Sequence, residues 1–524
     1  MSAGVRAGVL VRRSAQGATA LRGGRTWRPT PYQAAGFLFW LVLTLAYWRV
    51  PLCCDAGQHA AVVERLKADL SHPRHPMADL PGAGSAYYSP YALAEGGFAR
   101  LTGLGGWEVV RLAGPLNLLV LLTGVNRFVR VLTPRPWAPV LALLAMTLLW
   151  GTERAWWSGY LGLMSMTGNL GYPSTFAIGL TFWAWALTGT RARDPRRVRY
   201  VGPRGLPGLP GYAALGVLYG LVLLIHPITS VAAVLGAIAL AAGWQPRWTG
   251  PVLARWALTG ATALLTAAVW PYFDVFALAG DDSVDAMHRT LYRQLAGEFW
   301  LAAVVGLPAL WLRGRRSPRD PLVLMFVLDC LVVAYGWVSG HYTYGRILGL
   351  TLVPLQFALA VELAAPRPWR AGRRVLGWAA AAGAAAGFLT VQAGALIPAG
   401  FPQPPHWPAY AWAARHIGPG EVVITDGYYA VHAIAGYGPN LAAPAWPDPA
   451  LDERERARRE ADVRGYLAPD STRAERATVI RRYHVRWLLL TRWRPVPEEA
   501  VVVAWSERTG EVLARVGTAA TATR

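Results

Sequence analysis

The chain nearly lacks lysine and contains few cysteines. Its 524 residues include 51 lysines and arginines, of which Lys67 is the only lysine, so the net charge of +21 is almost wholly arginine. The arginines stand in short clusters between apolar blocks, which is typical of membrane topology signals, and a nucleic-acid partner is not expected. Two of the three cysteines, Cys53 and Cys54, are neighbours, which close a disulfide only with strain. With the distant Cys330 they make no disulfide framework, and redox chemistry is not expected.

Several nucleotide and metal motifs are also absent. The sequence has no Walker A lysine loop, no Gly-x-Gly-x-x-Gly after a strand, no Cys-x-x-Cys pair and no His-Glu-x-x-His. These absences argue against a protein driven by nucleotide hydrolysis and against a zinc protease.

Charge is scarce and apolar blocks are many. Only 15% of the residues are charged and 54% are hydrophobic, in blocks near the ~20 residues that cross a bilayer core. Tryptophan and tyrosine outnumber phenylalanine, which suits rings at the headgroup level. The sequence therefore predicts an α-helical polytopic membrane protein with about eleven transmembrane helices. The blocks are residues 37–50, 109–131, 138–150, 170–187, 211–225, 229–243, 251–272, 299–312, 322–338, 347–363 and 375–397.

The arginines predict which side each loop faces. Residues 1–33 carry arginines and no acid, and are too long and too arginine-rich for a signal peptide, so we expect a cytoplasmic tail. The loops on the same side then all contain arginine: 133–137, 191–204, 245–248, 313–320 and 366–374. The extracytoplasmic side receives 51–108, 151–169, 226–227, 273–298, 339–346 and the C-terminal region. We expect a multi-pass protein of the cell membrane whose function lies on that side.

The polar C-terminal region predicts a separate domain. A proline-rich connector at 398–408 follows the last block of the transmembrane domain, 34–398. Beyond it, 421–425 and 485–491 have the pattern of strands, and 451–467 and 471–484 that of polar helices. We therefore expect a small extracytoplasmic α/β domain over 399–524.

Asp55 follows the first apolar block and stands at the expected membrane boundary. It begins the segment 55–70, whose apolar residues recur at helical spacing and predict an amphipathic helix along the membrane interface. His59 lies four residues on and shares its face, where a carboxylate beside an imidazole could accept a proton or bind a cation. The alternative is that Asp55 only caps the helix.

Other polar groups of the extracytoplasmic loops are candidate ligands for a substrate. Tyr87 and Tyr88 belong to a segment rich in hydroxyl and aromatic groups, which suits the faces and edges of a sugar. Glu153 stands next to Arg154 and three aromatic residues, a pattern that a membrane aromatic belt with a surface ion pair explains more simply. His226 precedes a proline that explains the turn by itself, although ionisable groups at such a boundary are often functional.

Two further clusters come later in the chain. The acids at 281, 282 and 285 with His288 could hold a divalent metal, but they also form an ordinary helix start, which we favour; no metal and no cofactor are predicted. His341, Tyr344 and Arg346 bring an arginine into the outer end of a span. Such an arginine can hold a phosphate by a bidentate contact, or it can snorkel to the interface.

The layout resembles the GT-C superfamily of polytopic glycosyltransferases. The similar elements are a first span followed by Cys54-Asp55-Ala-Gly-Gln-His59, a Tyr-Ser-Pro-Tyr segment, a late span that begins Tyr344-Gly-Arg346, and a C-terminal α/β domain. The resemblance implies transfer of a sugar from a polyprenyl-phosphate donor to a glycan, lipid or protein acceptor of the envelope, with inversion.

The same resemblance implies roles for single residues. Asp55 would be the general base and Arg346 the ligand of the donor phosphate, while His59 and His226 would position either substrate. Many relatives have two acids in the first loop, whereas Ala56 follows Asp55 here, which puts metal dependence in doubt.

Two other functional classes remain open. A transporter or lipid flippase would place its site near the bilayer midplane, where Asp329 is the clearest buried acid, although Asp329 could equally close a helix-helix hydrogen bond. An inactive assembly subunit could use the same fold without catalysis.

Overall fold

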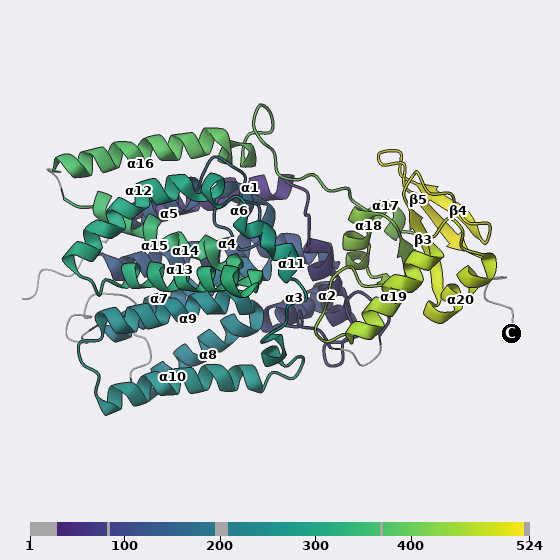
Figure 1. Cartoon of the computed structure of the whole chain (residues 1–524), viewed down its shortest axis with the longest axis horizontal. Coiled ribbons are helices and arrows are strands. Elements are labelled where there is room, and N and C mark those ends of the chain that lie inside the picture. The colour runs from purple at the N-terminus through teal and green to yellow at the C-terminus, as the bar shows by residue number, and fades with distance from the viewer. Residues whose placement is uncertain (1–28, 81–83, 194–207, 367–369, 518–524) are drawn as a thin grey trace, which may run out of the picture.

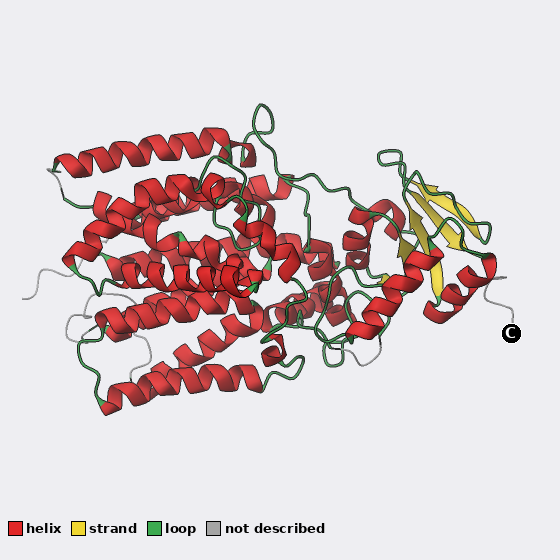
Figure 2. Cartoon of the chain, in the orientation of Figure 1, coloured by secondary structure: helices red, strands yellow, loops and turns green. Residues whose placement is uncertain are grey.

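The computed structural model describes residues 29–80, 84–193, 208–366 and 370–517, and Figure 1 shows their arrangement. A large helical bundle occupies one end of the molecule, and a small sheet with its helices occupies the other (Figure 2). Most of the predicted N-terminal tail and of the loop 191–204 lies outside the described residues.

Each of the eleven predicted apolar blocks coincides with helical structure. Ten of them correspond to single helices: α1 (Pro31–Arg49), α4 (Gly106–Leu132), α5 (Ala138–Leu148), α7 (Pro173–Ala192), α8 (Leu209–Ile225), α9 (Pro227–Trp244), α10 (Gly250–Ala268), α12 (Leu295–Arg316), α13 (Pro321–Ser339) and α16 (Ala371–Thr390). The remaining block is a broken helix made of η3 (Tyr342–Ile347), α14 (Leu348–Thr351) and α15 (Val353–Leu363).

Five helical segments of the described chain are long and apolar enough to cross a membrane: α4, α9, α12, α13 and the composite 342–363. Two shorter apolar helices, α5 and α8, accompany them. The chain is therefore a multi-pass membrane protein. The composite segment is the most enclosed of the five, with 89% of its apolar window buried inside the protein.

Local sequence signals explain where these helices begin. Proline occupies the first turn of α1, α7, α9 and α13, where its missing N–H costs no intrahelical bond. Thr30 and Gln33 form a capping box at α1, and Asp320 accepts from the backbone of Leu322 at the start of α13. The sequence thus contains the helix boundaries as well as the apolar blocks.

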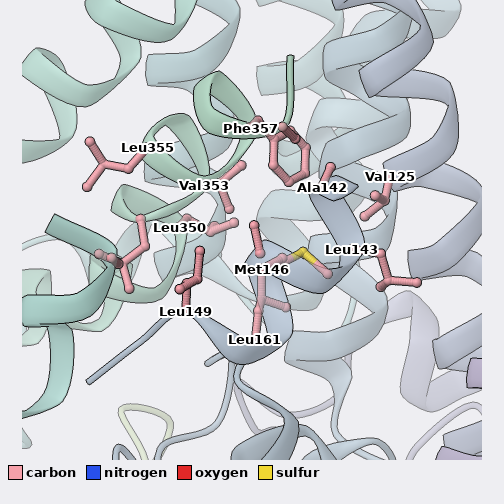
Figure 3. Packing of buried hydrophobic residues seen from close by; sticks show 14 of the residues in the cluster. Val125, Ala142, Leu143, Met146, Leu149, Leu161, Leu350, Val353, Leu355 and Phe357 are labelled. Carbon is pink, nitrogen blue, oxygen red and sulfur yellow. The ribbon is translucent and has the colours of Figure 1, made fainter. Parts of the chain in front are cut away.

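The core of the bundle combines aliphatic and aromatic side chains and includes nearly all of α15. Figure 3 shows Met146 of α5 and Leu149, which follows that helix, near Val353 and Phe357 of α15. All four side chains are essentially inaccessible to solvent. This packing holds the composite segment 342–363, which carries Arg346 near its start, inside the bundle.

Short elements cover the end of the bundle that faces the C-terminal region (Figure 1). They are α2 (Ala56–Ala68), α3 (Pro90–Thr102), α6 (Leu163–Asn169), η1 (Val275–Leu278), α11 (Asp285–His288), η2 (Arg289–Tyr292) and η4 (Gln392–Ala395). All except η4, which follows the last apolar helix, come from the loops that we expected on one side of the membrane.

The C-terminal region forms a five-stranded mixed sheet in the order β2-β1-β3-β5-β4. Its elements are α17 (Ala411–Ala414), β1 (Val422–Thr425), α18 (Tyr428–Ala433), η5 (Ile434–Tyr437), β2 (Asn440–Leu441), α19 (Glu453–Tyr466), α20 (Arg473–Tyr483), β3 (Val485–Leu490), β4 (Ala500–Trp505) and β5 (Val512–Val516). Strand β1 is parallel to β2 and β3, while β5 is antiparallel to β3 and β4. The two predicted strands and two predicted helices are present, and β2, β4 and β5 were not predicted.

Helix α2 joins this region to the bundle. The Arg65 guanidinium donates to the carbonyls of Gly438 and Pro439 over 2.8 and 2.9 Å and to Oδ1 of Asn440 over 2.5 Å. The predicted helix is present, but it does not lie freely along a membrane interface. Eight of its thirteen residues are buried, because α3, α4 and η5 pack around it.

Candidate functional site

Asp55 stands at the start of α2 without capping it. The residue occupies the N-cap position, yet its side chain makes no capping hydrogen bond. It is half-buried. Burial raises the pKa of the carboxyl above its usual range, and the charge of Arg346 opposes that shift. The side chain of Asp55 therefore does not cap α2, in contrast to the alternative interpretation of the sequence.

The backbone beside Asp55 is unusual. Cys54 has φ +59°, the left-handed conformation that residues with a Cβ adopt at a cost. The hydroxyl of Tyr172 donates to the carbonyl of Cys53 over 2.5 Å and fixes the same stretch from the bundle side. Strain of this kind gathers at functional sites, because the surrounding structure must enforce it.

Arg346 lies in η3, at the start of the most enclosed segment. Its Nη2 donates to the carbonyl and to Oγ of Ser158 over 3.2 and 3.3 Å, and its guanidinium carbon lies 5.8 Å from the ring centre of Trp157. Its Nε–H is buried and has no hydrogen-bond partner within the described part of the chain. The guanidinium is held by these contacts with the loop 151–169, and its Nε–H remains available for an acceptor.

The charges of Asp55 and Arg346 interact, although the two side chains form no ion pair among the described residues. Tyr87 and Tyr172 belong to the same group, because each interacts electrostatically with the carboxylate of Asp55 and with the guanidinium of Arg346. The ring of His59 packs edge-on against Tyr172 and Tyr87, at centroid distances of 5.1 and 5.7 Å. Burial lowers the pKa of His59 to about 4, so its imidazole is neutral at physiological pH.

A hydrogen-bonded chain that the sequence did not predict supports Arg346 from behind. Nη1 of Arg346 lies 3.2 Å from Nε2 of His288. Nδ1 of His288 lies 2.9 Å from Oγ1 of Thr343, and that hydroxyl donates to Oδ1 of Asp285 over 2.6 Å. Oδ2 of Asp285 lies 3.1 Å from Nδ1 of His341. The predicted residue His341 is thus joined to Arg346 through Asp285, which is itself buried.

His226 lies at the edge of this group. Its Nδ1 is 2.7 Å from Oγ1 of Thr229, and it accepts the backbone N–H of Thr229 at the start of α9. Electrostatic interactions connect it to both His59 and Arg346. The proline explanation of the turn holds, since Pro227 begins α9, and His226 is nevertheless part of the cluster.

Three predicted site residues lie elsewhere. Tyr88 is buried and donates to the carbonyl of Arg74, so it packs the loop and does not line the site. Tyr344 lies beside Tyr335 of α13, with ring centres 5.7 Å apart. Tyr88 lies in an irregular loop, whereas Tyr344 belongs to η3 and faces α13.

Glu153 is the third of these residues. It is exposed and lies against Gly297 at the start of α12. Within the described residues it makes no hydrogen bond to the group around Asp55 and Arg346. The exposed position of Glu153 agrees with the simpler interpretation, in which this loop forms part of a membrane aromatic belt.

The acidic cluster does not gather into a metal site. Asp281 bonds the backbone and hydroxyl of Ser283, while Asp285 begins the four-residue helix α11, four residues later than the predicted start. Across the described residues, no group of three or more His, Cys, Asp or Glu side chains could hold a metal ion.

Comparisons with known proteins give a fold and no family. No family model matches the chain, and a search of curated proteins finds no match. The structure is similar to archaeal oligosaccharyltransferase AglB from Archaeoglobus fulgidus, solved with an inhibitory peptide and a dolichol-phosphate: TM-score 0.50, 10% identity, 88% of this chain and 69% of that chain covered.

It is also similar to arabinofuranosyltransferase AftD from mycobacteria, with a TM-score of 0.53 at 15% identity. That similarity covers 93% of this chain but only 40% of AftD, so the chain spans well under half of that protein. Identities this low establish the fold alone. The predicted architecture, a helical membrane bundle with a small C-terminal α/β domain, is thus similar to the folds of two solved glycosyltransferases.

Proposed function

We propose that the chain is a membrane glycosyltransferase that moves a sugar from a polyprenyl-phosphate donor to an envelope acceptor at the extracytoplasmic face, with inversion. One observation carries the proposal. Arg346, whose Nε–H is buried and unpaired among the described residues, interacts electrostatically with Asp55, a carboxylate that makes no capping bond. An unpaired buried donor calls for an acceptor that the protein itself does not supply.

A phosphate is the acceptor that suits Arg346. The guanidinium presents donors in a planar fork and carries a permanent charge, which matches phosphate oxygens. As the glycosidic C–O bond breaks, negative charge grows on the departing polyprenyl phosphate. A preorganised cation then stabilises the transition state more than the ground state.

Asp55 supplies the complementary chemistry. Its carboxylate accepts the proton of an acceptor hydroxyl while the oxygen attacks the anomeric carbon from the face opposite the phosphate. The electron pair of the broken bond leaves on the phosphate oxygen. A raised pKa makes the carboxylate a stronger base, and general-base catalysis contributes about 10²- to 10⁴-fold in rate.

The two fold relatives support a lipid-linked donor. AglB is an oligosaccharyltransferase whose structure holds a dolichol-phosphate, and AftD is an arabinofuranosyltransferase. The proposal includes eleven membrane crossings, a cytoplasmic N-terminus, a transmembrane domain over 34–398 and an extracytoplasmic domain over 399–524. Arginine in the loops at the far end of the bundle supports this orientation.

The test uses the full chain in lipid nanodiscs with undecaprenyl-phosphate linked to mannose, glucose, galactose or arabinofuranose. Release of undecaprenyl phosphate and a mass gain on the acceptor fraction are measured together. Asp55→Asn and Arg346→Met should each reduce transfer by on the order of 10²-fold or more. Glu153→Gln is the matched control, because it removes an exposed acid outside the site. Full transfer by Asp55→Asn would exclude the base assignment.

A transporter or flippase is the alternative that one observation favours. Asp329 lies within α13, is buried, and its Oδ1 has no hydrogen-bond partner among the described residues. However, α13 is the least enclosed of the five candidate spans. Movement of the lipid-linked sugar across the bilayer of a proteoliposome, without formation of product, would favour this alternative. Neither product nor movement would favour an inactive assembly subunit.

A further inference from the structure

Aromatic side chains from three segments of the C-terminal region gather in one cluster. The cluster consists of Trp407, Tyr428, Tyr429, His432 and Trp446. Tyr429 lies 5.0 Å from Trp407 and 5.4 Å from Tyr428 between ring centres. His432 lies 4.9 Å from Tyr428 and stacks on Trp446 at 4.6 Å. The five rings form a continuous aromatic surface, which we call the aromatic platform.

The platform runs from the protein interior to the solvent. His432 is 5% exposed, whereas Tyr429 is 43% and Tyr428 is 62% exposed. Large aromatic rings left open to water, on a base of buried ones, are a common form of a binding surface. Nδ1 of His432 and Nε1 of Trp446 are buried, and neither has a hydrogen-bond partner in the described chain. These two atoms can bond a polar ligand that reaches them.

The platform borders Asp55. Tyr428 lies within electrostatic range of Asp55 and Cys54. Helix α18, which carries Tyr428 and His432, packs on α2 (Figure 1). The approach is so close that a Cβ on Gly57 would meet the carbonyl oxygen of His432 at 2.0 Å. A ligand that lies on Tyr428 therefore reaches the carboxylate from the side of the C-terminal region.

A hollow of about 330 Å³ adjoins the buried end of the platform. His432 lines it together with Thr425 at the end of β1, and Glu460 and Arg464 of α19 supply charged groups. It lies where the parallel strands β1 and β2 end, the edge at which α/β sheets bind ligands. Its volume is near the lower limit of about 300 Å³ for small-ligand pockets.

This combination suits a carbohydrate better than a lipid tail or an anion. A sugar ring presents C–H groups on its faces and hydroxyls on its edges, so it can stack on a ring and hydrogen-bond at its rim. The platform offers open rings, tyrosine hydroxyls and two unpaired N positions. None of its five members is cationic at neutral pH, since burial lowers the pKa of His432 to about 4.

We propose that the aromatic platform binds the acceptor and that this acceptor is a carbohydrate chain, whose sugar ring stacks on Tyr428 and Tyr429 and directs a hydroxyl toward Asp55. The inference rests on the proposed function in one respect, namely that Asp55 activates an acceptor hydroxyl. It adds the chemical class of the acceptor and the surface that holds it.

The test measures binding with no donor present. Full-length protein in nanodiscs is titrated with maltotriose, α-1,6-linked mannotriose or α-1,5-linked arabinofuranotriose, and saturation-transfer NMR follows the sugar protons. At least one probe should bind saturably to the unaltered protein. Tyr428→Ala with Tyr429→Ala should weaken that binding on the order of tenfold, and Tyr428→Phe should restore most of it. Trp493→Ala removes another exposed aromatic residue of the same region and should change nothing.

Three results would overturn the inference. Binding that is unaffected by the double alanine variant would exclude the platform as the site. Failure of every oligosaccharide to bind would exclude a carbohydrate, as would saturable binding of only a control peptide or a short-chain phospholipid. Transfer from the lipid-linked sugars named above to the same oligosaccharides is measured on the same samples. If the unaltered protein releases no polyprenyl phosphate and extends no oligosaccharide, the proposed function fails separately, and the NMR result still decides whether the platform binds sugar.

Discussion

Arg346 donates from Nη1 to Nε2 of His288 over 3.2 Å, and this contact fixes the direction of the whole hydrogen-bond chain behind it. Arginine can only donate and an ionised carboxylate can only accept. His288 therefore carries its proton on Nδ1 and donates it to Thr343, whose hydroxyl donates to Asp285. Burial and the charge of Arg346 lower the pKa of His288 to about 3, which keeps the imidazole neutral and able to accept.

This chain makes His288 a positioning residue for the arginine that is proposed to hold the donor phosphate. His288→Phe removes the acceptor and should raise the KM for the lipid-linked donor by on the order of tenfold, the loss of one hydrogen bond to a charged group. His288→Gln keeps an acceptor oxygen near the Nε2 position and should recover most of the affinity. Steady-state kinetics with varied donor checks both. Equal loss in the two variants would indicate a purely structural role.

The pH dependence of transfer should report the environment of Asp55. The base works only when ionised, so the rate should fall as the pH drops through its pKa, which burial holds above the ordinary aspartate range. Arg346 opposes that rise. Arg346→Met should therefore move the acid limb of the residual activity to higher pH, whereas Arg346→Lys, which keeps the charge, should leave it near its original position. A limb that moves to lower pH in Arg346→Met would contradict the pairing.

The sequence predicted that Asp55, His59, Tyr87, His226 and Arg346 lie on one side of the membrane, because that prediction rests on topology. Each of these residues stands in a loop or at the end of an apolar block, and counting the blocks places all of those loops at one end of the bundle. That argument needs only the spacing of apolar runs and the positions of arginines. The same argument cannot tell Tyr87 from Tyr88, because an irregular loop has no periodicity that assigns a face.

The hydrogen-bonded chain behind Arg346 could not be predicted from the sequence, and the reason is a different one. His288 and Thr343 are 55 residues apart, and their contact depends on how two loops pack at the end of the bundle. In the sequence, Asp285 and His288 have the same pattern as an ordinary helix start. Strands β4 and β5 were missed because they pair across a turn whose residues carry no strong hairpin signal.

Cys54 offers a test of the backbone strain next to Asp55. Its φ of +59° is accessible to glycine without cost, and costs other residues about 1–2 kcal/mol. Cys54→Gly should therefore be more thermally stable than Cys54→Ala, the reverse of the usual order for these two residues. Thermal inactivation of the two variants under reducing conditions checks this. An alanine variant as stable as the glycine variant would mean that the turn relaxes.

Gly57 and Gly97 form a matched pair for the contact between α2 and the C-terminal region. A Cβ on Gly57 would lie 2.0 Å from the carbonyl oxygen of His432, which is backbone and must shift, whereas a Cβ on Gly97 of α3 meets nothing within 4 Å. Gly57→Ala should therefore push α18 away from Asp55, abolish most of the transfer and open the connector before α17 to limited proteolysis. Gly97→Ala should keep activity and gain about 0.5–1 kcal/mol of helix stability. Because both substitutions add one methyl group to a helix of the same loop, the difference between them isolates the close approach of α18. Unchanged transfer and proteolysis in Gly57→Ala would show that Asp55 works without the C-terminal region held in this place.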